Sequence, residues 1–119
     1  MLPKRRRLTR SEDYVRVRRT GRSRAHPLLI LAATRNGDEE TRVGITVGKS
    51  VGTAVARNRA KRLLREAARS RLPCIRRGYD LVLTGRRETA TAGLDDVCAA
   101  LDLLLRRAGI LANNGDGGP

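Results

Sequence analysis

The 119-residue sequence contains few of the side chains on which enzymes usually depend. It has no tryptophan or phenylalanine, two tyrosines, one histidine and two cysteines. Cys74 and Cys98 are far apart in the sequence and His26 is close to neither, so the spacing is not that of metal ligands. We expect two free thiols, buried or half-buried, in a reducing compartment, most simply the bacterial cytoplasm.

Long apolar runs are also missing. No segment approaches the roughly 18 consecutive apolar residues of a membrane-spanning helix. The basic N-terminus is not followed by the apolar stretch of a secretory signal. The sequence therefore predicts a cytoplasmic protein without a membrane partner.

Acidic residues are few, with 12 of them against 26 lysines and arginines. A two-metal nuclease needs several carboxylates that converge on a pair of ions. Here the acids are scattered over turns, a strand and a helix start, where turn formation and capping explain them (Asp38, Glu39, Glu40, Asp80, Asp95 and Asp96). No Ser/His/Asp or Cys/His combination is credible, and residues 44–49 do not have the spacing of a P-loop. We expect neither catalytic residues nor a metal site in the protein.

Positive charge dominates, with a formal net charge of +14. It is concentrated in residues 1–24, with ten lysines and arginines, and in residues 49–71, with eight. Such a charge indicates a polyanionic partner, because each neutralised phosphate releases counterions. Most of the cations are arginines, whose planar guanidinium can bind two phosphate oxygens at once.

The hydrophobic pattern predicts one domain at residues 11–111, with a basic arm at 1–10 and a flexible tail at 112–119. Helices are expected at 12–19, capped by Ser11 and ended by Gly21, at 52–69, and from 91 or 92 to 107, ended by Gly109. Strands are expected at 28–33, 42–48 and 79–84, with a weaker one at 22–25. We predict that the strands at 28–33 and 42–48 form a hairpin around a turn at 36–38. Two helices can then cover one face of a small sheet in an α+β domain.

The segment 52–69 has the pattern of one helix with two opposed faces. One face is apolar (Ala56, Ala60, Leu63, Leu64 and Ala67) and the other is polar and basic (Arg57, Asn58, Lys61, Arg65 and Arg69). Basic helix faces usually alternate with glutamate, but this one has only Glu66, so a merely solvated face is the weaker interpretation. We interpret it as an RNA-binding face, on which Arg57, Lys61 and Arg65 follow phosphates and Asn58 holds a base edge or a phosphate. Arg59 and Arg62 point to its flanks.

Two residues outside this helix extend the surface. Lys49 precedes the helix N-terminus, a favourable place for a phosphate. Tyr14, on the sparsely apolar first helix, is either a stacking residue for a single-stranded base or a packing residue, and the sequence leaves both open.

Residues 44–69, GITVGKSVGTAVARNRAKRLLREAAR, resemble the signature of the bacterial ribonuclease P protein subunit. Its centre is Arg57-Asn58-Arg59, and the likeness extends over roughly residues 2–111, including LPKRRRLTRSEDY near the start. The resemblance implies a two-layer α/β sandwich in the order α-β-β-β-α-β-α, similar to the second domain of ribosomal protein S5. It also implies a left-handed βαβ crossover through the central helix, although the general rule for such units is right-handed.

The resemblance further implies that the protein binds the catalytic RNA and the 5′ leader of precursor tRNA. It would promote Mg²⁺-dependent endonucleolytic removal of the leader, with the chemistry performed by the RNA and Mg²⁺ held mainly by RNA phosphates. One monomeric protein would bind each RNA. The implied leader contacts are Tyr14, Arg18, Ile30, Arg57, Asn58, Lys61 and Arg65. The implied contacts with the catalytic RNA are Lys49, Arg59, Arg62, Arg69 and Arg86.

The sequence departs from the family in its aromatic residues. Members often carry a second aromatic one turn after Tyr14, where Arg18 stands, and another on the first long strand, where Ala32 stands. We therefore expect the leader to be held more by charge and less by stacking. Two other classes remain: a structural RNA-binding protein or RNA chaperone, which the composition fits equally well, and an autonomous nuclease, which the scattered carboxylates disfavour. Only the signature at 44–69 separates the first of these from ribonuclease P.

Overall fold

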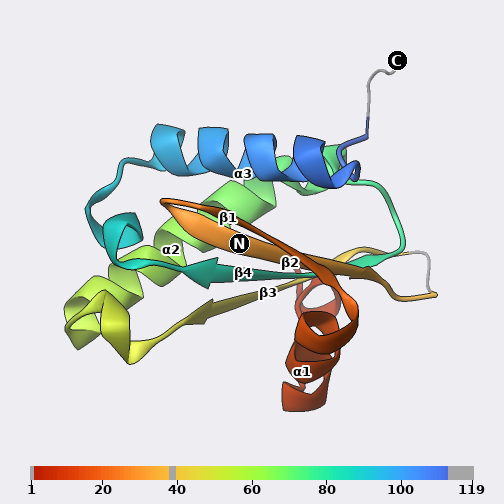
Figure 1. The fold of residues 1–119 in the computed structure, drawn as a ribbon, viewed down its shortest axis with the longest axis horizontal. Helices are drawn as coiled ribbons and strands as arrows, with labels where there is room; N and C mark the ends of the chain where they lie inside the picture. Colours follow the sequence, from red (N-terminus) through yellow and green to blue (C-terminus); the bar gives the residue numbers. More distant parts are fainter. Residues whose placement is uncertain (1, 38–39, 113–119) are drawn as a thin grey trace.

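A four-stranded sheet forms the centre of the computed structural model, which describes residues 2–37 and 40–112 (Figure 1). The strands are β1 (Arg22–His26), β2 (Leu29–Arg35), β3 (Arg42–Val47) and β4 (Tyr79–Gly85), in the order β1-β2-β4-β3. The β1–β2 and β2–β4 pairs are antiparallel, whereas β3 and β4 are parallel. Both edge strands, β1 and β3, therefore have one side free for other contacts.

Helices cover both faces of this sheet. The helices α2 (Ala54–Arg71) and α3 (Leu94–Ala108) lie on one face, and α1 (Ser11–Thr20) lies on the other (Figure 1). Short 3₁₀ turns occur at η1 (Lys4–Arg6), η2 (Lys49–Val51), η3 (Leu72–Cys74) and η4 (Arg87–Thr91). The predicted α+β class and the order α-β-β-β-α-β-α are confirmed.

The predicted hairpin between residues 28–33 and 42–48 is wrong. Strand β4 lies between β2 and β3 and pairs with both of them. Leu81, Val82 and Leu83 are almost completely buried, so β4 gains most from a central position with both faces covered. The hairpin is instead formed by β1, the weakly predicted strand, and β2. Of the turn predicted at 36–38, residue 38 lies outside the described residues.

The helix boundaries follow local capping. The Thr53 hydroxyl accepts a hydrogen bond from the Ala56 N–H at 3.2 Å, which starts α2 at Ala54. Ser11 was predicted to cap α1, but Arg10 occupies that position and Ser11 is already helical. Helix α3 begins later than predicted because residues 87–91 form η4. Gly109 ends α3 with a φ of +74°, a conformation that glycine adopts without strain.

Most of the core lies between the sheet and the α2–α3 layer. Helix α2 buries the small residues Ala60, Ala67 and Ala68 together with Leu64, which is 0% exposed. Leu63, predicted to be a main core residue, is only partly buried at the edge of this cluster. On the other face, Val17 of α1 forms a smaller cluster with Leu8, Ala32 and Val82. Tyr14 packs against this cluster.

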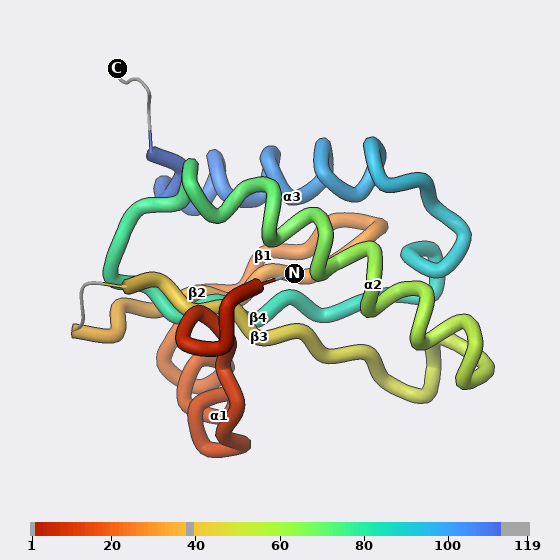
Figure 2. The backbone as a smooth tube through the Cα atoms, turned by 180° about the vertical axis from the view of Figure 1, so that it is seen from behind, coloured from red at the N-terminus to blue at the C-terminus, as the bar shows by residue number. Residues whose placement is uncertain are grey.

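The N-terminal arm belongs to the fold. Leu2 and Leu8 are each 4% exposed, and the Leu8 N–H donates to the Val43 carbonyl of β3 at 3.0 Å. Arg6 Nε donates to the Thr41 carbonyl at 2.7 Å. The arm thus runs along the free edge of β3, between α1 and α2 (Figure 2). The arm that was predicted to lie outside the domain therefore packs against it.

The remaining sequence expectations concern single features. Cys74 and Cys98 are free and half-buried, as predicted. No helix in the described ranges combines the length and the apolar character required to cross a bilayer. Apart from Ala112, the predicted flexible tail lies outside the described residues.

Candidate nucleic-acid interface

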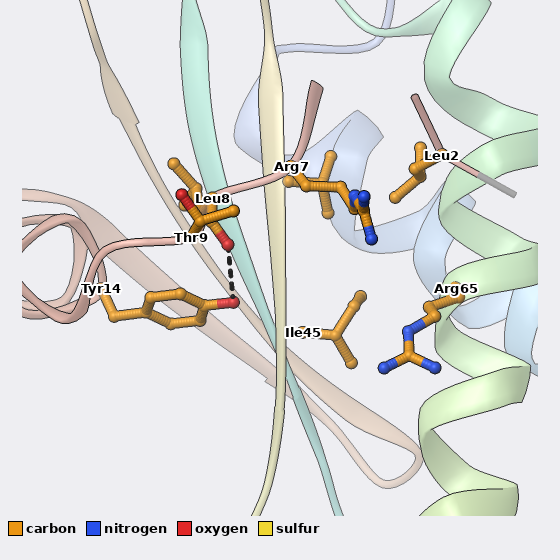
Figure 3. A pocket seen from close by; sticks show the side chains of 8 residues that line it. Leu2, Arg7, Leu8, Thr9, Tyr14, Ile45 and Arg65 are labelled. Carbon is orange, nitrogen blue, oxygen red and sulfur yellow. Dashed lines mark hydrogen bonds between the residues drawn. The ribbon is translucent and has the colours of Figure 1, made fainter. Parts of the chain in front are cut away.

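A pocket of about 330 Å³ lies where the N-terminal arm, α1 and α2 meet at the edge of β3 (Figure 3). We call it the β3-edge pocket. Its apolar walls come from the arm, from β3 and from Tyr14, and its charged groups come from the arm and from α2. The lining residues are Leu2, Arg7, Leu8, Thr9, Tyr14, Val43, Ile45 and Arg65.

Tyr14 is fixed in this pocket by two contacts. Its hydroxyl donates a hydrogen bond to the Leu8 carbonyl at 3.2 Å, which joins α1 to the arm. Its ring lies against Gly44 of β3, where an added Cβ would come within 2.6 Å of the ring carbon Cζ. A residue without a side chain is therefore needed at position 44 for the ring to lie this close to the strand. Tyr14 packs against the small core cluster, so the packing role is confirmed; it also lines the pocket, where stacking on a base stays a prediction.

Two guanidinium groups flank the apolar part of the pocket. Arg7 extends from the arm and Arg65 from α2, and both point toward Ile45 (Figure 3). Among the residues that the structure describes, no carboxylate lines this pocket. An apolar surface between two guanidiniums can receive a nucleobase while the cations bind the neighbouring phosphates.

The outer face of α2 carries a second, shallower groove of about 450 Å³, which we call the α2 groove. It is lined by Val55, Asn58, Lys61, Arg62 and Arg65. Arg65 lines both hollows, so the α2 groove and the β3-edge pocket adjoin at that residue. The predicted separation of Arg62 from Asn58, Lys61 and Arg65 is not present, because these positions are three or four residues apart on one helical face.

The other predicted helix residues have partners within the fold. Arg59 is turned toward η4, where Nε donates to the Ala90 carbonyl at 2.7 Å and Nη2 to the carbonyl of Ala92, just after η4, at 3.3 Å. Arg57 Nη1 donates to the Gly52 carbonyl at 3.4 Å, at the start of the helix. Arg59 therefore does point to a flank as predicted, but there it holds the η4 segment against α2.

The remaining residues predicted to contact the catalytic RNA lie at the two ends of α2. Lys49 and Arg86 are exposed beyond the ends of β3 and β4, and the parallel pairing of Val47 with Gly85 places them at the same end of the sheet. Arg69 lies near the other end of α2, where it forms an ion pair with Glu66 at 3.0 Å.

Only Tyr14 and Arg65 of the predicted leader contacts line the β3-edge pocket, and Ile30 and Arg18, like Arg57, line neither this pocket nor the α2 groove. Ile30 is on β2, which β4 separates from β3, and Arg18 is exposed on the turn of α1 that follows Tyr14. Conversely, Arg7, Leu2 and Ile45 line the pocket but were not predicted. The apolar Leu2 and Leu8 within a basic run were the available sign that the arm packs against the domain.

A buried carboxylate anchors α1 beside the pocket. Asp80 of β4 is 0% exposed and accepts hydrogen bonds from Arg42 Nε at 3.0 Å, Arg42 Nη2 at 2.8 Å and Asn36 Nδ2 at 3.0 Å. Arg16 of α1 donates to the same carboxylate. Burial raises the pKa of Asp80, but these donors outweigh it and hold the pKa below its ordinary value of 3.8. The ion pair with Arg16 ties α1, and with it Tyr14, to the sheet.

In the described part of the chain, no three His, Cys, Asp or Glu side chains gather in a way that could hold a metal ion. The buried carboxylate of Asp80 is already paired with two guanidiniums.

Comparison with known proteins agrees with this geometry. The sequence profile of the Ribonuclease P family matches residues 2–109. The chain is 42% identical over 102 residues to the ribonuclease P protein component of Herpetosiphon aurantiacus, covering 86% of this chain and 83% of that protein. It is 41% identical over 106 residues to that of Dehalococcoides mccartyi, with 89% and 87% covered.

Solved structures give the same result. The Staphylococcus aureus RNase P protein superposes with a TM-score of 0.79 at 25% identity, over 89% of this chain and 97% of that one. The RNase P protein from Thermotoga maritima superposes with a TM-score of 0.75 at 28% identity, over 85% and 96%. From the profile match, these relatives and the shared fold, we conclude that the chain belongs to the ribonuclease P protein family.

Proposed function

We propose that the protein binds the 5′ leader of precursor tRNA in the β3-edge pocket and the catalytic RNA of ribonuclease P along the exposed basic residues of α2 and its two ends. The observation that carries this proposal is that Arg65 lines both hollows. A single strand that leaves the β3-edge pocket at Arg65 meets Lys61 and Asn58 next, on the same face of α2. The pocket supplies an apolar surface for one base, and the helix supplies cations for the following phosphates.

The cleavage itself is assigned to the RNA. Mg²⁺ bound by RNA phosphates would supply the Lewis acid and the activated water, and the protein would position the substrate strand. The one carboxylate that is fully buried in the described structure, Asp80, stabilises the attachment of α1. The side chains of this chain would therefore contribute binding and orientation.

We further propose that this protein holds the leader mainly by charge. Tyr14 is the only aromatic residue among those that line the β3-edge pocket, whereas Arg7 and Arg65 both flank it. Leader affinity should thus fall steeply with salt, by about 0.7–0.9 in log affinity per log salt for each phosphate that is neutralised. A shallow salt slope combined with a large loss of affinity in Tyr14→Ala would contradict a charge-dominated pocket.

Cleavage of precursor tRNA tests the proposed function directly. The substrate is incubated at low Mg²⁺ with the protein, with the ribonuclease P RNA of the same organism, or with both. We expect the protein alone to be inactive and to increase cleavage by the RNA. Cleavage by the protein alone would assign the chemistry to the protein, and the absence of any gain over the RNA would favour a structural RNA-binding role.

Single variants of α2 test the assignment of the site. Lys61→Ala and Arg65→Ala should weaken binding of precursor tRNA by the holoenzyme without lowering the melting temperature, because both side chains line the α2 groove outside the core. Arg76→Ala is the matched control, since Arg76 is exposed and lines neither hollow. A tRNA lacking the leader should show no such difference between the variants and the control.

A further inference from the structure

A third hollow with basic residues lies at the β1 edge of the sheet, opposite the β3 edge. It has a volume of about 310 Å³ and is lined by Arg22 and Arg24 of β1, Arg35 of β2 and Tyr79 of β4, with Ala108 and Ile110 at the end of α3. Thr20, Ala33 and Thr34 complete the lining. We call it the β1-edge pocket. Three strand spacings of about 4.8 Å, or about 14 Å in total, separate β1 from β3.

The strand register explains why these arginines gather. Arg22 pairs with Ala33 and Arg24 with Leu31, so both arginines lie on the sheet face that carries the main core. Arg35 pairs with Tyr79 on the same face. Because α3 ends at Ala108, this part of the sheet is not covered by the helix and the arginines surround a hollow.

The charge of the pocket has no counterion within the described structure. None of its lining residues is acidic, and no ion pair joins Arg22, Arg24 or Arg35 to a described carboxylate. The Nε of Arg24 is shielded from solvent and has no hydrogen-bond partner among the described residues. A desolvated guanidinium donor without an acceptor is unfavourable, so this arrangement is suited to an anion that enters the pocket.

Tyr79 gives the pocket a fixed wall. The guanidinium of Arg35 lies 5.4 Å from the centre of its ring, a distance at which a cation and an aromatic face attract each other. This contact limits the positions that Arg35 can adopt. Three guanidiniums held around one hollow match the oxygens of a phosphodiester, which arginine binds with paired hydrogen bonds.

We propose that the β1-edge pocket binds a backbone phosphate of an RNA segment separate from the one bound at α2. This inference rests on the proposed function, because it takes the partner to be RNA. Both the catalytic RNA and precursor tRNA supply this phosphodiester chemistry. The protein would then hold RNA at two opposite edges of the sheet.

The test uses Arg22→Gln/Arg35→Gln, because both side chains are exposed and their loss should leave the fold intact. Arg24→Gln is avoided, since its partly buried side chain also lies near the end of α3 and can favour that helix end electrostatically. The control is Arg76→Gln/Arg87→Gln, which removes the same charge from exposed positions outside all three hollows. Affinity is measured against salt in two arms, one with the ribonuclease P RNA and one with precursor tRNA alone.

Loss of this one phosphate contact should lower the salt slope by about 0.7–0.9 and the affinity at 0.15 M salt by about 4- to 6-fold, in the arm whose RNA occupies the pocket. The control should change both quantities much less. Equal effects of the two double variants in both arms would overturn the inference. Lys61→Ala/Arg65→Ala is measured in parallel. If this variant weakens binding and Arg22→Gln/Arg35→Gln does not, only the inference about the β1-edge pocket is rejected. If neither double variant weakens binding, the proposed function itself is rejected.

Discussion

The ion pair between Asp80 and Arg16 gives the most informative single substitution, Asp80→Asn. The carboxylate is 0% exposed, whereas the side chains of Arg16 and Arg42 are 37% and 33% exposed. Removing one partner of a buried ion pair typically costs about 3–5 kcal/mol, because the other charge is left without compensation. Both arginines here can recover part of their hydration, so we expect the free energy of unfolding to fall by about 2–3 kcal/mol. At about 4 °C per kcal/mol for a domain of this size, the melting temperature should fall by about 8–12 °C.

The pH dependence of this difference provides an independent check. Because the pKa of Asp80 in the folded state lies below the ordinary value of 3.8, its carboxylate contributes stability that is fully present above that pH. The contribution is lost as the pH falls below 3.8 toward the lowered folded pKa. Urea unfolding of the wild type and of Asp80→Asn should therefore differ most near neutrality and converge in strong acid.

Glu66→Gln is the matched control for this experiment. It removes a carboxylate that pairs with Arg69 at 3.0 Å on the exposed face of α2, and the melting temperature should not change measurably. If Asp80→Asn melted with the control, or if its deficit stayed constant down to pH 3, the ion pair would not be what attaches α1. Leader affinity should fall together with stability, since α1 carries Tyr14 into the β3-edge pocket.

Four further substitutions test the remaining geometry. In chemical denaturation, Leu64→Ala should lower the free energy of unfolding by about 3–5 kcal/mol and Leu63→Ala by clearly less, because only Leu64 is fully buried. Equal losses for the two variants would contradict the orientation of α2. Gly44→Ala should displace the Tyr14 ring, because the new Cβ would lie 2.6 Å from the ring carbon Cζ. Leader affinity measured by fluorescence titration should then fall several-fold, and an unchanged affinity would exclude this ring position. Arg59→Ala should lower the free energy of unfolding by about 1 kcal/mol even without RNA, because its hydrogen bonds to the Ala90 and Ala92 carbonyls are lost. A variant as stable as the wild type would mean that Arg59 contributes only to RNA binding.

Much of the fold was readable because its signals are local. Thr53 at the start of α2, Gly109 at the end of α3 and the apolar periodicity between them act within a few residues of chain. The amphipathic character of α2 likewise predicted which side of this helix faces the core and which carries Asn58, Lys61 and Arg65. Family membership came from the same stretch, because the signature at 44–69 is continuous in the sequence.

Strand pairing was decided by the tertiary structure. Residues 28–33 and 42–48 suggested a hairpin because they are neighbours in the chain, whereas β4 takes the place between them, more than thirty residues later. The gain from burying Leu81 and Val82 on the two faces of a central strand exceeds the advantage of a short connection. A local sequence pattern cannot show which of these two free energies is larger, because the competing strands are distant in the chain.

The β3-edge pocket shows the same division between sequence and structure. The sequence by itself determined that α2 carries a basic face, that Tyr14 is one of only two aromatic residues and that the net charge favours a polyanionic partner. Only the tertiary structure decided that Arg7 and Leu2 of the arm join Tyr14 and Arg65 in one hollow, and that Arg59 is used inside the fold. The physical reason is that burying Leu2 and Leu8 against the edge of β3 fixes the arm, and this long-range contact places charges that are distant in the chain around one pocket.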